Sequence, residues 1–290
     1  MRKMSLLAAL LLALPLLAQT DAQLFEQGKA AMQTNDADKA IAAFEKAVAK
    51  NPKKAEYHYW LGNAYGLAAR KANMFSQMSL GKKVGAEFNQ AVALDPNYLD
   101  ARMGVLEFDL QAPGIMGGGE DKALAQAAEI RKRDAFLGHR AYARIYNFQK
   151  KPDLARNEWL TAVKQEPNNP KMHYGLAGFY ANIDKNFPAA MAEAETAVRV
   201  DPGYMPGWFR IAQVAALSGQ NLPRGEEAMK KYLAYKPKEN EPGAFDANYN
   251  MGMILEKAGR NAEARASYQA ALKMAPMSKT VAEALKRVGG

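Results

Sequence analysis

The amino-acid sequence predicts an all-α protein built as an α-solenoid of helical hairpins. Alanine is abundant, β-branched residues are sparse, and charged residues of both signs recur at helical spacing, which favours helices over sheets. Prolines expected to end helices stand at Pro52, Pro96, Pro167, Pro202, Pro237 and Pro276, at intervals of 44, 71, 35, 35 and 39 residues. Such a recurrence is typical of a repeat array, and the 290 residues leave room for one.

The clearest hairpin lies between Phe245 and Met277. Its first helix is marked by Met251, Gly252 and Leu255, and its second by Ala264, Tyr268 and Ala271. Gly259 suits the left-handed conformation that ends a helix, Asn261 can cap the next helix, and Pro276 stops it. One hairpin is too small to bury its own apolar face, so we expect neighbours of the same kind.

The same slots recur along the chain in a fixed order: a large residue, a Leu-Gly pair or its equivalent, Tyr, Ala, an aromatic residue, Ala and Pro. In the second unit they hold His58, Leu61, Gly62, Tyr65, Val84, Phe88, Ala91 and Pro96, and in the fourth His139, Tyr142, Ala143, Tyr146, Ala155, Trp159, Ala162 and Pro167. The fifth unit, read in the same way, holds Tyr174, Ala177 and Gly178. At these offsets the sequence resembles the tetratricopeptide-repeat family, in its exported bacterial form, whose period is about 34 residues.

The resemblance implies an array over residues 23–276 with about seven repeats, at 21–54, 55–98, 99–135, 136–169, 171–204, 205–239 and 245–278. In the third repeat, Asp109 stands where the family usually has an aromatic residue. Residues 277–290 then form a capping helix whose apolar stripe is Val281, Leu285 and Val288. A solenoid needs such a half-polar lid over its last apolar surface.

Residues 1–22 read as a signal peptide. Arg2 and Lys3 precede an apolar run from Leu6 to Leu17, and Ala18 or Ala22 offers a small residue for cleavage. The run is short for a membrane span, although an uncleaved anchor is the alternative. We therefore expect an exported protein that is periplasmic or secreted, and no other stretch reaches transmembrane length.

The chain contains no cysteine, which excludes disulfides, thiolate metal ligands and a cysteine nucleophile. The formal net charge is +9. A basic surface can bind nucleic acid, but an exported protein rarely meets any. We expect a protein or peptide partner and no nucleic acid.

Two repeats are longer than the others. In the second repeat the extra residues lie between its two helices, where Met74, Phe75, Met78 and Leu80 are apolar. We expect long helices that bury these side chains against each other. The alternative is that residues Met74–Leu80 form an exposed contact surface for a partner or a membrane.

The third repeat contains a glycine-rich loop from Pro113 to Gly119. Bare amides ahead of a helix can hold a phosphate. However, Glu120 and Asp121 stand where a phosphate-binding loop has lysine and serine or threonine, and the loop follows a helix. We interpret it as an inter-helix loop. The alternative is an enzyme or small-ligand site at Gly114–Gly119.

No catalytic, cofactor-binding or metal-binding residue is predicted. His58 and His139 occupy one repeat slot and His173 lies beside that slot, which indicates packing. No arrangement of nucleophile and base stands out. The chain is therefore not expected to be an enzyme and needs no cofactor.

The resemblance implies that the first helix of each repeat lines a concave groove that binds an extended peptide. The slots that the repeat leaves free hold Phe25, Lys29, Tyr59, Asn63, Arg140, Arg144, Asn147, Phe179, Asn182, Phe209, Gln213, Tyr249 and Met253. Aromatic rings among arginines and amides suit peptide recognition. The alternative is that several of the rings pack against the neighbouring helix.

The function expected is that of an exported scaffold in the bacterial envelope. The site at the glycine loop and a purely structural envelope spacer remain as alternatives. The sequence leaves the partner, the biological process and the oligomeric state open.

Overall fold

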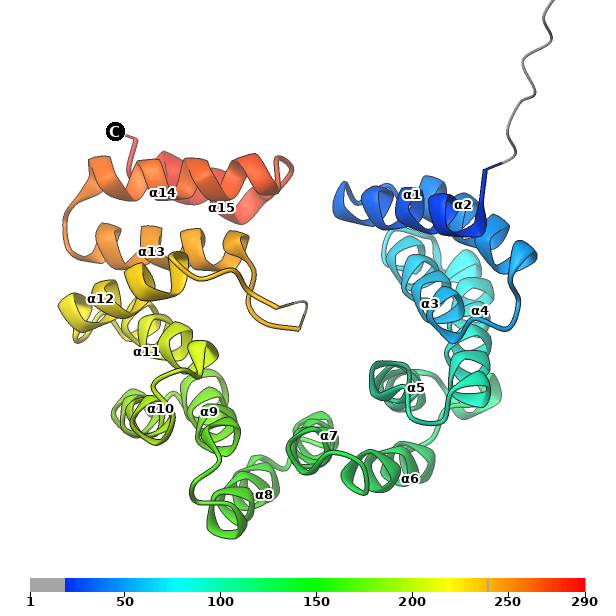
Figure 1. Cartoon of the computed structure of the whole chain (residues 1–290), viewed down its shortest axis with the longest axis horizontal. Coiled ribbons are helices and arrows are strands. Elements are labelled where there is room, and N and C mark those ends of the chain that lie inside the picture. Colours follow the sequence, from blue (N-terminus) through cyan, green and yellow to red (C-terminus); the bar gives the residue numbers. More distant parts are fainter. Residues whose placement is uncertain (1–18, 239, 290) are drawn as a thin grey trace, which may run out of the picture. The chain divides into compact units, whose positions relative to one another are not determined.

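The computed structural model describes residues 19–238 and 240–289, which form fifteen α-helices and contain no strand. The expected signal peptide lies almost wholly outside these residues, since residues 1–18 are not described. Two compact units divide the chain, Met1–Asp95 and Pro96–Gly290. Each unit is a stack of antiparallel helical hairpins, as predicted (Figure 1).

Unit 1 contains two hairpins. Its helices are α1 (Asp21–Gln33), α2 (Ala37–Lys50), α3 (Ala55–Ala69) and α4 (Met74–Leu94). Phe44 and Tyr57 are fully buried in the core between them. Side chains from all four helices contribute to this one apolar cluster, so the two hairpins share a core.

Unit 2 contains five hairpins and a last helix. The elements are α5 (Leu99–Gln111), η1 (Gly114–Met116), α6 (Glu120–Arg131), α7 (Ala135–Phe148), α8 (Pro152–Gln165), α9 (Pro170–Phe179), η2 (Tyr180–Asp184), α10 (Phe187–Val200), α11 (Met205–Ser218), α12 (Leu222–Leu233), α13 (Ala244–Lys257), α14 (Asn261–Met274) and α15 (Lys279–Arg287). Each helix packs on the next, and the first helices of successive hairpins also touch: α5 with α7, α7 with α9, α9 with α11, and α11 with α13. The first helices therefore form one continuous face of unit 2.

The helix ends follow the prolines. Helices α2, α4, α8, α10 and α14 each end two residues before a proline. The ring of proline disfavours helical geometry in the residue that precedes it, so the helix stops there. The predicted role is confirmed for these five prolines, whereas α12 already ends at Leu233, four residues before Pro237.

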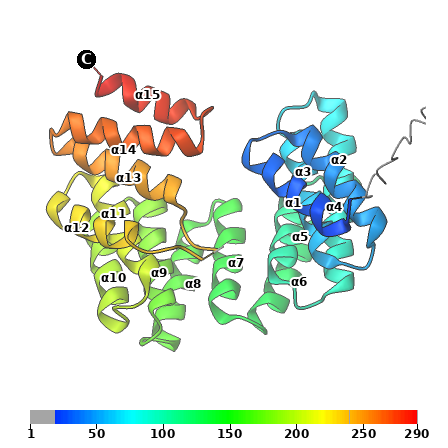
Figure 2. The ribbon, with the colours of Figure 1, turned by 45° about the horizontal axis from the view of Figure 1, so that its top comes forward.

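The predicted capping helix is confirmed as α15, which lies on α14 at the end of unit 2 (Figure 2). Val281 and Val288 are buried, while Lys279, Glu283 and Lys286 are exposed. The Ser278 side chain accepts a hydrogen bond from the Val281 amide and begins the helix. One face of α15 thus closes the core and the other meets water.

In four of the first helices, α3, α5, α9 and α11, one slot holds a polar side chain that bonds to the turn before the helix. His58 Nε2 donates to the Pro52 carbonyl, and its Nδ1 lies 2.6 Å from a Glu87 carboxylate oxygen. His173 makes the same pair of contacts with Pro167 and Glu193. These buried polar groups are therefore satisfied.

Other residues occupy the same slot elsewhere. Trp208 Nε1 donates to the Pro202 carbonyl at 3.0 Å, and His139 Nδ1 lies 2.6 Å from Glu158. All three histidines thus share one slot and one contact, that of Nδ1 with a glutamate of the next helix. The expectation that His173 lies beside the slot is wrong by one residue.

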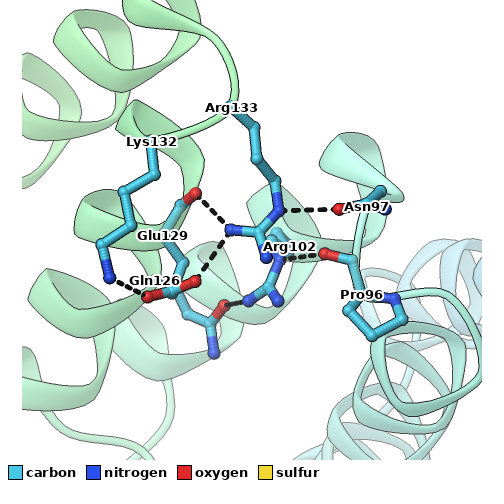
Figure 3. A network of polar contacts seen from close by, with 7 residues as sticks. All are labelled: Pro96, Asn97, Arg102, Gln126, Glu129, Lys132 and Arg133. Carbon is cyan, nitrogen blue, oxygen red and sulfur yellow. Dashed lines mark hydrogen bonds and ion pairs between the residues drawn. The ribbon is translucent and has the colours of Figure 1, made fainter.

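In the third repeat this slot holds Arg102 (Figure 3). Its Nε donates to the Pro96 carbonyl at 2.7 Å and its Nη1 to Gln126 at 2.9 Å. Close by, hydrogen bonds from Lys132 and then from Arg133 hold the pKa of Glu129 at about 2. The poorest repeat by sequence thus makes the same contact with its preceding turn as His58, His173 and Trp208 make.

The one-residue error in the fifth repeat has a structural cause. Helix α9 ends in the π-helical turn η2, which takes in one extra residue before α10 begins. Ala177, fully buried, is therefore the counterpart of Gly62, and Tyr174 with Gly178 takes the positions predicted for Gly175 with Phe179. Equal spacing along the chain cannot reveal a turn of a different pitch.

The insertion in the second repeat also differs from the expectation. It extends α4 alone to 21 residues, whereas the other second helices of the hairpins have 12 to 14. Leu80 is partly buried, but Met74 and Phe75 are 75% and 86% exposed. The expected burial of these side chains between two long helices is wrong for the first turns of α4.

Across residues 19–238 and 240–289, none of the helices combines the length and the apolar character that a membrane crossing requires.

Candidate functional site

A groove of about 1400 Å³ runs along the face that the first helices of unit 2 share. It is lined by residues of α5, α7, α9 and α11 and by five residues of the loop between α12 and α13: Tyr235, Lys238, Asn240, Glu241 and Pro242. Regular stacking of the hairpins puts one residue pair from each first helix on this face. The groove therefore follows directly from the repeat.

Five of the predicted residues line this groove: Arg140, Arg144, Asn147, Phe179 and Asn182. Arg140 and Asn182 are exposed. Arg144 is already engaged, because its Nε and Nη2 donate to the two carboxylate oxygens of Glu107 at 2.6 and 2.8 Å. The hydrogen bonds to Glu107 raise the pKa of Arg144. Arg140 is thus better placed than Arg144 to meet a ligand.

Three of the predicted rings are buried, contrary to the expected exposure. Phe25 stacks on Tyr57 with ring centres 4.7 Å apart, and Phe209 meets Tyr232 at 5.2 Å. Phe179 is 4% exposed because the π turn shifts its repeat by one residue. For these rings the packing alternative holds.

The remaining predicted residues do not line the groove. Lys29, Tyr59 and Asn63 belong to unit 1, where the Lys29 ammonium lies over the rings of Phe25 and Trp60. Tyr249 and Met253 pack against the C-terminal core. The Asn63 amide donates to the Tyr59 carbonyl of its own helix.

A residue that was not predicted, Arg210, dominates the groove chemically. It lies on α11, is only 9% exposed, and lines the groove. Its Nη1 donates to Gln213, and its guanidinium carbon lies 4.2 Å from the centre of the Tyr174 ring. Its Nε has no hydrogen-bond partner among the described residues. A buried cation is costly unless it is paired, so this arrangement lacks an anion.

The surrounding residues are shaped to admit Arg210. A Cβ atom on Gly178 would lie 2.9 Å from Arg210 Nη2, so a side chain there would displace the guanidinium. Tyr174 meets Tyr204 edge to face at 5.9 Å, and burial raises the pKa of the Tyr204 hydroxyl. The Tyr204 hydroxyl therefore stays neutral at physiological pH and supplies no charge to Arg210.

A sequence signal for this site exists. Arg210 is the one charged residue in the helix MPGWFRIAQVAALS, and a lone charge in an apolar helix marks a buried cation. The repeat pattern instead predicted Phe209 and Gln213, which lie on either side of Arg210 in the sequence, as groove residues. Only Gln213 belongs to the site, since it accepts the hydrogen bond from Arg210.

Among the described residues that line the groove, positively and negatively charged side chains are equal in number. The cations are Arg140, Arg144, Lys171, Arg210 and Lys238, and the carboxylates are Asp100, Glu107, Asp134, Asp201 and Glu241. A groove with five charges of each sign has no general attraction for a polyanion. It favours a ligand of mixed charge.

Four amides of the glycine loop are already paired. The amides of Met116 and Gly118 donate to the Pro113 carbonyl, that of Gly117 to Gly114, and that of Gly119 to Asp109. A phosphate loop needs such amides unpaired. The loop is closed on itself, and Lys122 Nζ adds a 2.6 Å bond to the Gly117 carbonyl.

No group of three or more histidine, aspartate and glutamate side chains is placed to hold a metal ion within the described ranges 19–238 and 240–289. The three histidines are occupied by the packing contacts described above.

Known structures of similar fold are repeat solenoids. A tetratricopeptide repeat protein from Parabacteroides merdae has a TM-score of 0.51 at 14% identity over 94% of this chain and all of that one. Yeast Tom70 reaches 0.54 at 12% identity over 94% of this chain and 64% of its own. A human IFIT1 dimer with m7Gppp-AAAA has a TM-score of 0.54 at 20% identity, over 93% of this chain and 62% of the IFIT1 chain.

These identities are low and show a shared fold alone. The chain spans 48% of the length of the matched chain in the APC/C hetero-tetramer Cut9-Hcn1, and 62% of that of IFIT1. No curated protein matches the sequence significantly.

Family models match most of the hairpins. The TPR repeat model matches residues 28–67, and the tetratricopeptide repeat model matches residues 140–205 and 214–278. Together they cover more than half of the chain and fall on the helices of both units. The chain belongs to the tetratricopeptide-repeat family.

Proposed function

We propose that this protein is an exported scaffold of the bacterial cell envelope that binds a segment of a partner protein in the groove of unit 2. We further propose that a carboxylate of that segment pairs with Arg210. The observation that carries the proposal is a buried guanidinium that faces a large groove without an acidic partner among the described residues.

The size of the groove favours a peptide. Four first helices contribute to it, and packed helices lie about 8–10 Å apart, so the groove is on the order of 27 Å long. An extended chain rises about 3.3 Å per residue, which gives room for about eight residues. The volume of about 1400 Å³ also exceeds the roughly 300–1000 Å³ of small-molecule pockets.

The charge pattern supports a protein ligand over a nucleic acid. Carboxylates of α5, of the turns before α7 and α11, and of the loop between α12 and α13 stand among the cations, and they repel a continuous phosphate backbone. Asn147 and Asn182 can bond to a peptide backbone, and Tyr174 supplies apolar area. We assign no catalytic step to the chain, since tetratricopeptide repeats typically act as scaffolds.

Export is proposed from residues 1–22. In α1 the Thr20 hydroxyl accepts from the Gln23 amide, and the Gln23 side chain accepts from the Thr20 amide. Cleavage after Ala18 keeps this capping box, whereas cleavage after Ala22 removes it along with the first turn. We therefore expect the mature protein to begin at Gln19, which its intact mass in a periplasmic extract measures.

Binding is tested with a library of random nonapeptides, each made with carboxylate or amide side chains at one position. The wild-type protein should select peptides with a carboxylate. Arg210→Gln should lose that selection, by at least about tenfold in Kd, since a buried charge pair stabilises a complex by about 2 kcal/mol or more. Arg199→Gln, an exposed arginine outside the groove, is the matched control.

Two results would overturn the proposal. One is equal selection of acidic and amidated peptides by the wild-type protein. The other is tighter binding of a single-stranded RNA oligonucleotide than of any peptide, which would make the chain a nucleic-acid-binding protein. Circular dichroism of Arg210→Gln must match that of the wild type for the comparison to count.

A further inference from the structure

The first two turns of α4 present large apolar side chains to solvent. Met74 is 75% exposed, Phe75 86% and Met78 43%. On the opposite side of the same helix, Leu80 and Val84 pack into the core of unit 1. We name Met74, Phe75 and Met78 the tip cluster. The packing of the hairpin does not explain why these apolar side chains are exposed.

The segment around the tip cluster is basic. From Tyr57 to Ala86 the sequence contains no aspartate or glutamate. Four cations lie in this segment, named here the basic cluster: Arg70, Lys71, Lys82 and Lys83. No side chain of the cluster makes an ion pair among the described residues, so its charge is not cancelled locally.

Two lysines of the basic cluster are held in place by contacts within unit 1. Lys71 Nζ donates to the Asn35 carbonyl at 2.9 Å, and Lys83 Nζ lies 4.8 Å from the centre of the Tyr65 ring. The carboxylates that approach these lysines are engaged elsewhere: Asp36 pairs with Lys39, and Glu45 accepts from Tyr65.

Helical geometry places apolar and basic side chains on one face. Residues 74, 78 and 82 are separated by four positions, so Met74, Met78 and Lys82 follow each other along one side of α4. Lys71 stands in the turn just before the helix. A short row of apolar side chains with a cation at each end is typical of segments that lie at a membrane interface.

The small area of the tip cluster favours a membrane surface over a protein as the partner. Three side chains supply far less than the roughly 1000 Å² that a stable protein interface buries. A lipid surface needs no complementary pocket, and it adds the attraction of anionic headgroups for each nearby cation. We propose that the start of α4 docks on an anionic lipid surface, with the tip cluster in the interface and the basic cluster facing the headgroups. This site lies in unit 1 and is independent of the groove.

The test is flotation of the full-length mature protein with vesicles. Vesicles of equal parts phosphatidylglycerol and phosphatidylcholine should carry the protein, and pure phosphatidylcholine vesicles should carry little. The bound fraction should fall as sodium chloride rises, because salt screens the headgroups.

Variants separate the contribution of the apolar tip cluster to vesicle binding from that of the basic cluster. The double variant Met74→Ser, Phe75→Ser should weaken binding by about tenfold or more, since these side chains no longer enter the interface. Replacing Lys82 and Lys83 by alanine should weaken it by about 25-fold, at about fivefold for each charge. Both sites are at the surface, and the thermal unfolding of each variant should match that of the wild type.

The matched controls change similar residues elsewhere. Met277→Ser removes a methionine that is 85% exposed, and Lys279→Ala with Lys286→Ala removes two exposed cations of α15. These controls should bind like the wild type. The proposal is overturned if the tip variants float as well as the controls, or if neutral and anionic vesicles bind equally. It is also overturned if a photo-crosslinker at Phe75 captures one protein in intact cells while vesicles bind none.

Discussion

At the scale of single residues, the first helices of unit 2 bury three charges in three different ways. Arg102 is satisfied by the Pro96 carbonyl and Gln126. Asp109 is 5% exposed and, within the described residues, has no ion pair. Arg210 lies over a ring and keeps one nitrogen unpaired. A buried charge without a partner costs free energy of folding, so such residues report either strain or a binding site.

Asp109 gives a prediction about pH. Burial raises the pKa of its carboxyl, with Lys122 opposing in part. The carboxyl of Asp109 therefore binds its proton more tightly in the folded protein than in the unfolded chain. Its contribution to the free energy of unfolding is most favourable at low pH and is lost as the pH rises through the folded-state pKa. Asparagine is neutral at every pH. Asp109→Asn should therefore raise the melting temperature at pH 7.

The measurement is thermal unfolding by circular dichroism at pH 7 and near pH 4. The gain should shrink at the lower pH, where the wild-type carboxyl takes up its proton. Asp153→Asn, which changes an exposed aspartate of α8, is the control. A wild-type protein more stable than Asp109→Asn at pH 7 would show that the carboxylate has a favourable partner.

Replacement of Arg102, in contrast to that of Asp109, should lower the stability of the protein. Methionine keeps much of the side-chain length but removes the guanidinium, which leaves the Pro96 carbonyl and Gln126 without their donor (Figure 3). Arg102→Met should cost about 1–3 kcal/mol in the free energy of unfolding, the penalty for an unsatisfied buried polar group.

Urea unfolding at neutral pH measures this cost. The control is Arg199→Met at an exposed site, which should change stability by less than about 0.5 kcal/mol. If the two variants are equally stable, the contacts of Arg102 with Pro96 and Gln126 do not stabilise the fold.

At the scale of elements, small irregularities in the hairpins decide which side chains reach the groove. The π turn η2 adds one residue after α9 and moves Phe179 into the core while Tyr174 faces the groove. It also places Asp184, whose carboxylate accepts two hydrogen bonds from Arg156 of α8 at 2.7 and 2.9 Å. The turn therefore joins two hairpins as well as shifting the register.

Deletion of Ile183 tests the origin of this turn. Ile183 is 44% exposed, and its loss restores the spacing found in the other short repeats, so the π turn can become α-helical. We expect a loss of stability within about 2 kcal/mol. Deletion of Leu176, buried in the middle of α9, should cost more than about 4 kcal/mol because it rotates every following side chain.

Thermal unfolding of the two deletion proteins makes the comparison. If both unfold at the same temperature, the π turn is no more tolerant of deletion than regular helix, and it does not arise from a single inserted residue.

At the scale of the whole molecule, apolar clusters within each unit hold the hairpins together. Unit 1 has its own cluster around Phe44 and Tyr57. In unit 2 the largest cluster runs from Ala177 to Val288 through three hairpins and α15. In a repeat array each hairpin contacts only its neighbours, so stability is nearly a sum of local terms. A unit with a complete set of contacts should fold by itself.

A fragment of residues 96–290 should therefore fold, with the far-ultraviolet spectrum of a helical protein and a cooperative thermal transition. A fragment of residues 187–290 is the control. It begins inside a hairpin, so α10 loses α9 and exposes Ala190 and Ala194. This shorter fragment should bind a hydrophobic dye and unfold at a lower temperature. Absence of a cooperative transition in residues 96–290 would show that unit 2 depends on unit 1.

The sequence by itself determined the all-α class, the hairpin repeat, the helix ends at the prolines and the capping helix. These follow from local rules, because helical periodicity and the geometry before proline act over a few residues. It also indicated where the period breaks, between the two helices of the second repeat and at the loop Pro113–Gly119. The same local rules explain the errors: equal spacing put Gly178 in place of Ala177, and no local signal reveals a π turn.

The tertiary structure alone decided which free slots meet solvent and which charges lack a partner. Phe25 and Phe209 are buried because rings of neighbouring helices face them, and Arg144 is neutralised by Glu107 from the previous hairpin. Arg210 became a candidate only when its surroundings were known. Burial and pairing depend on side chains far apart in the sequence, and a repeat pattern carries no information about them.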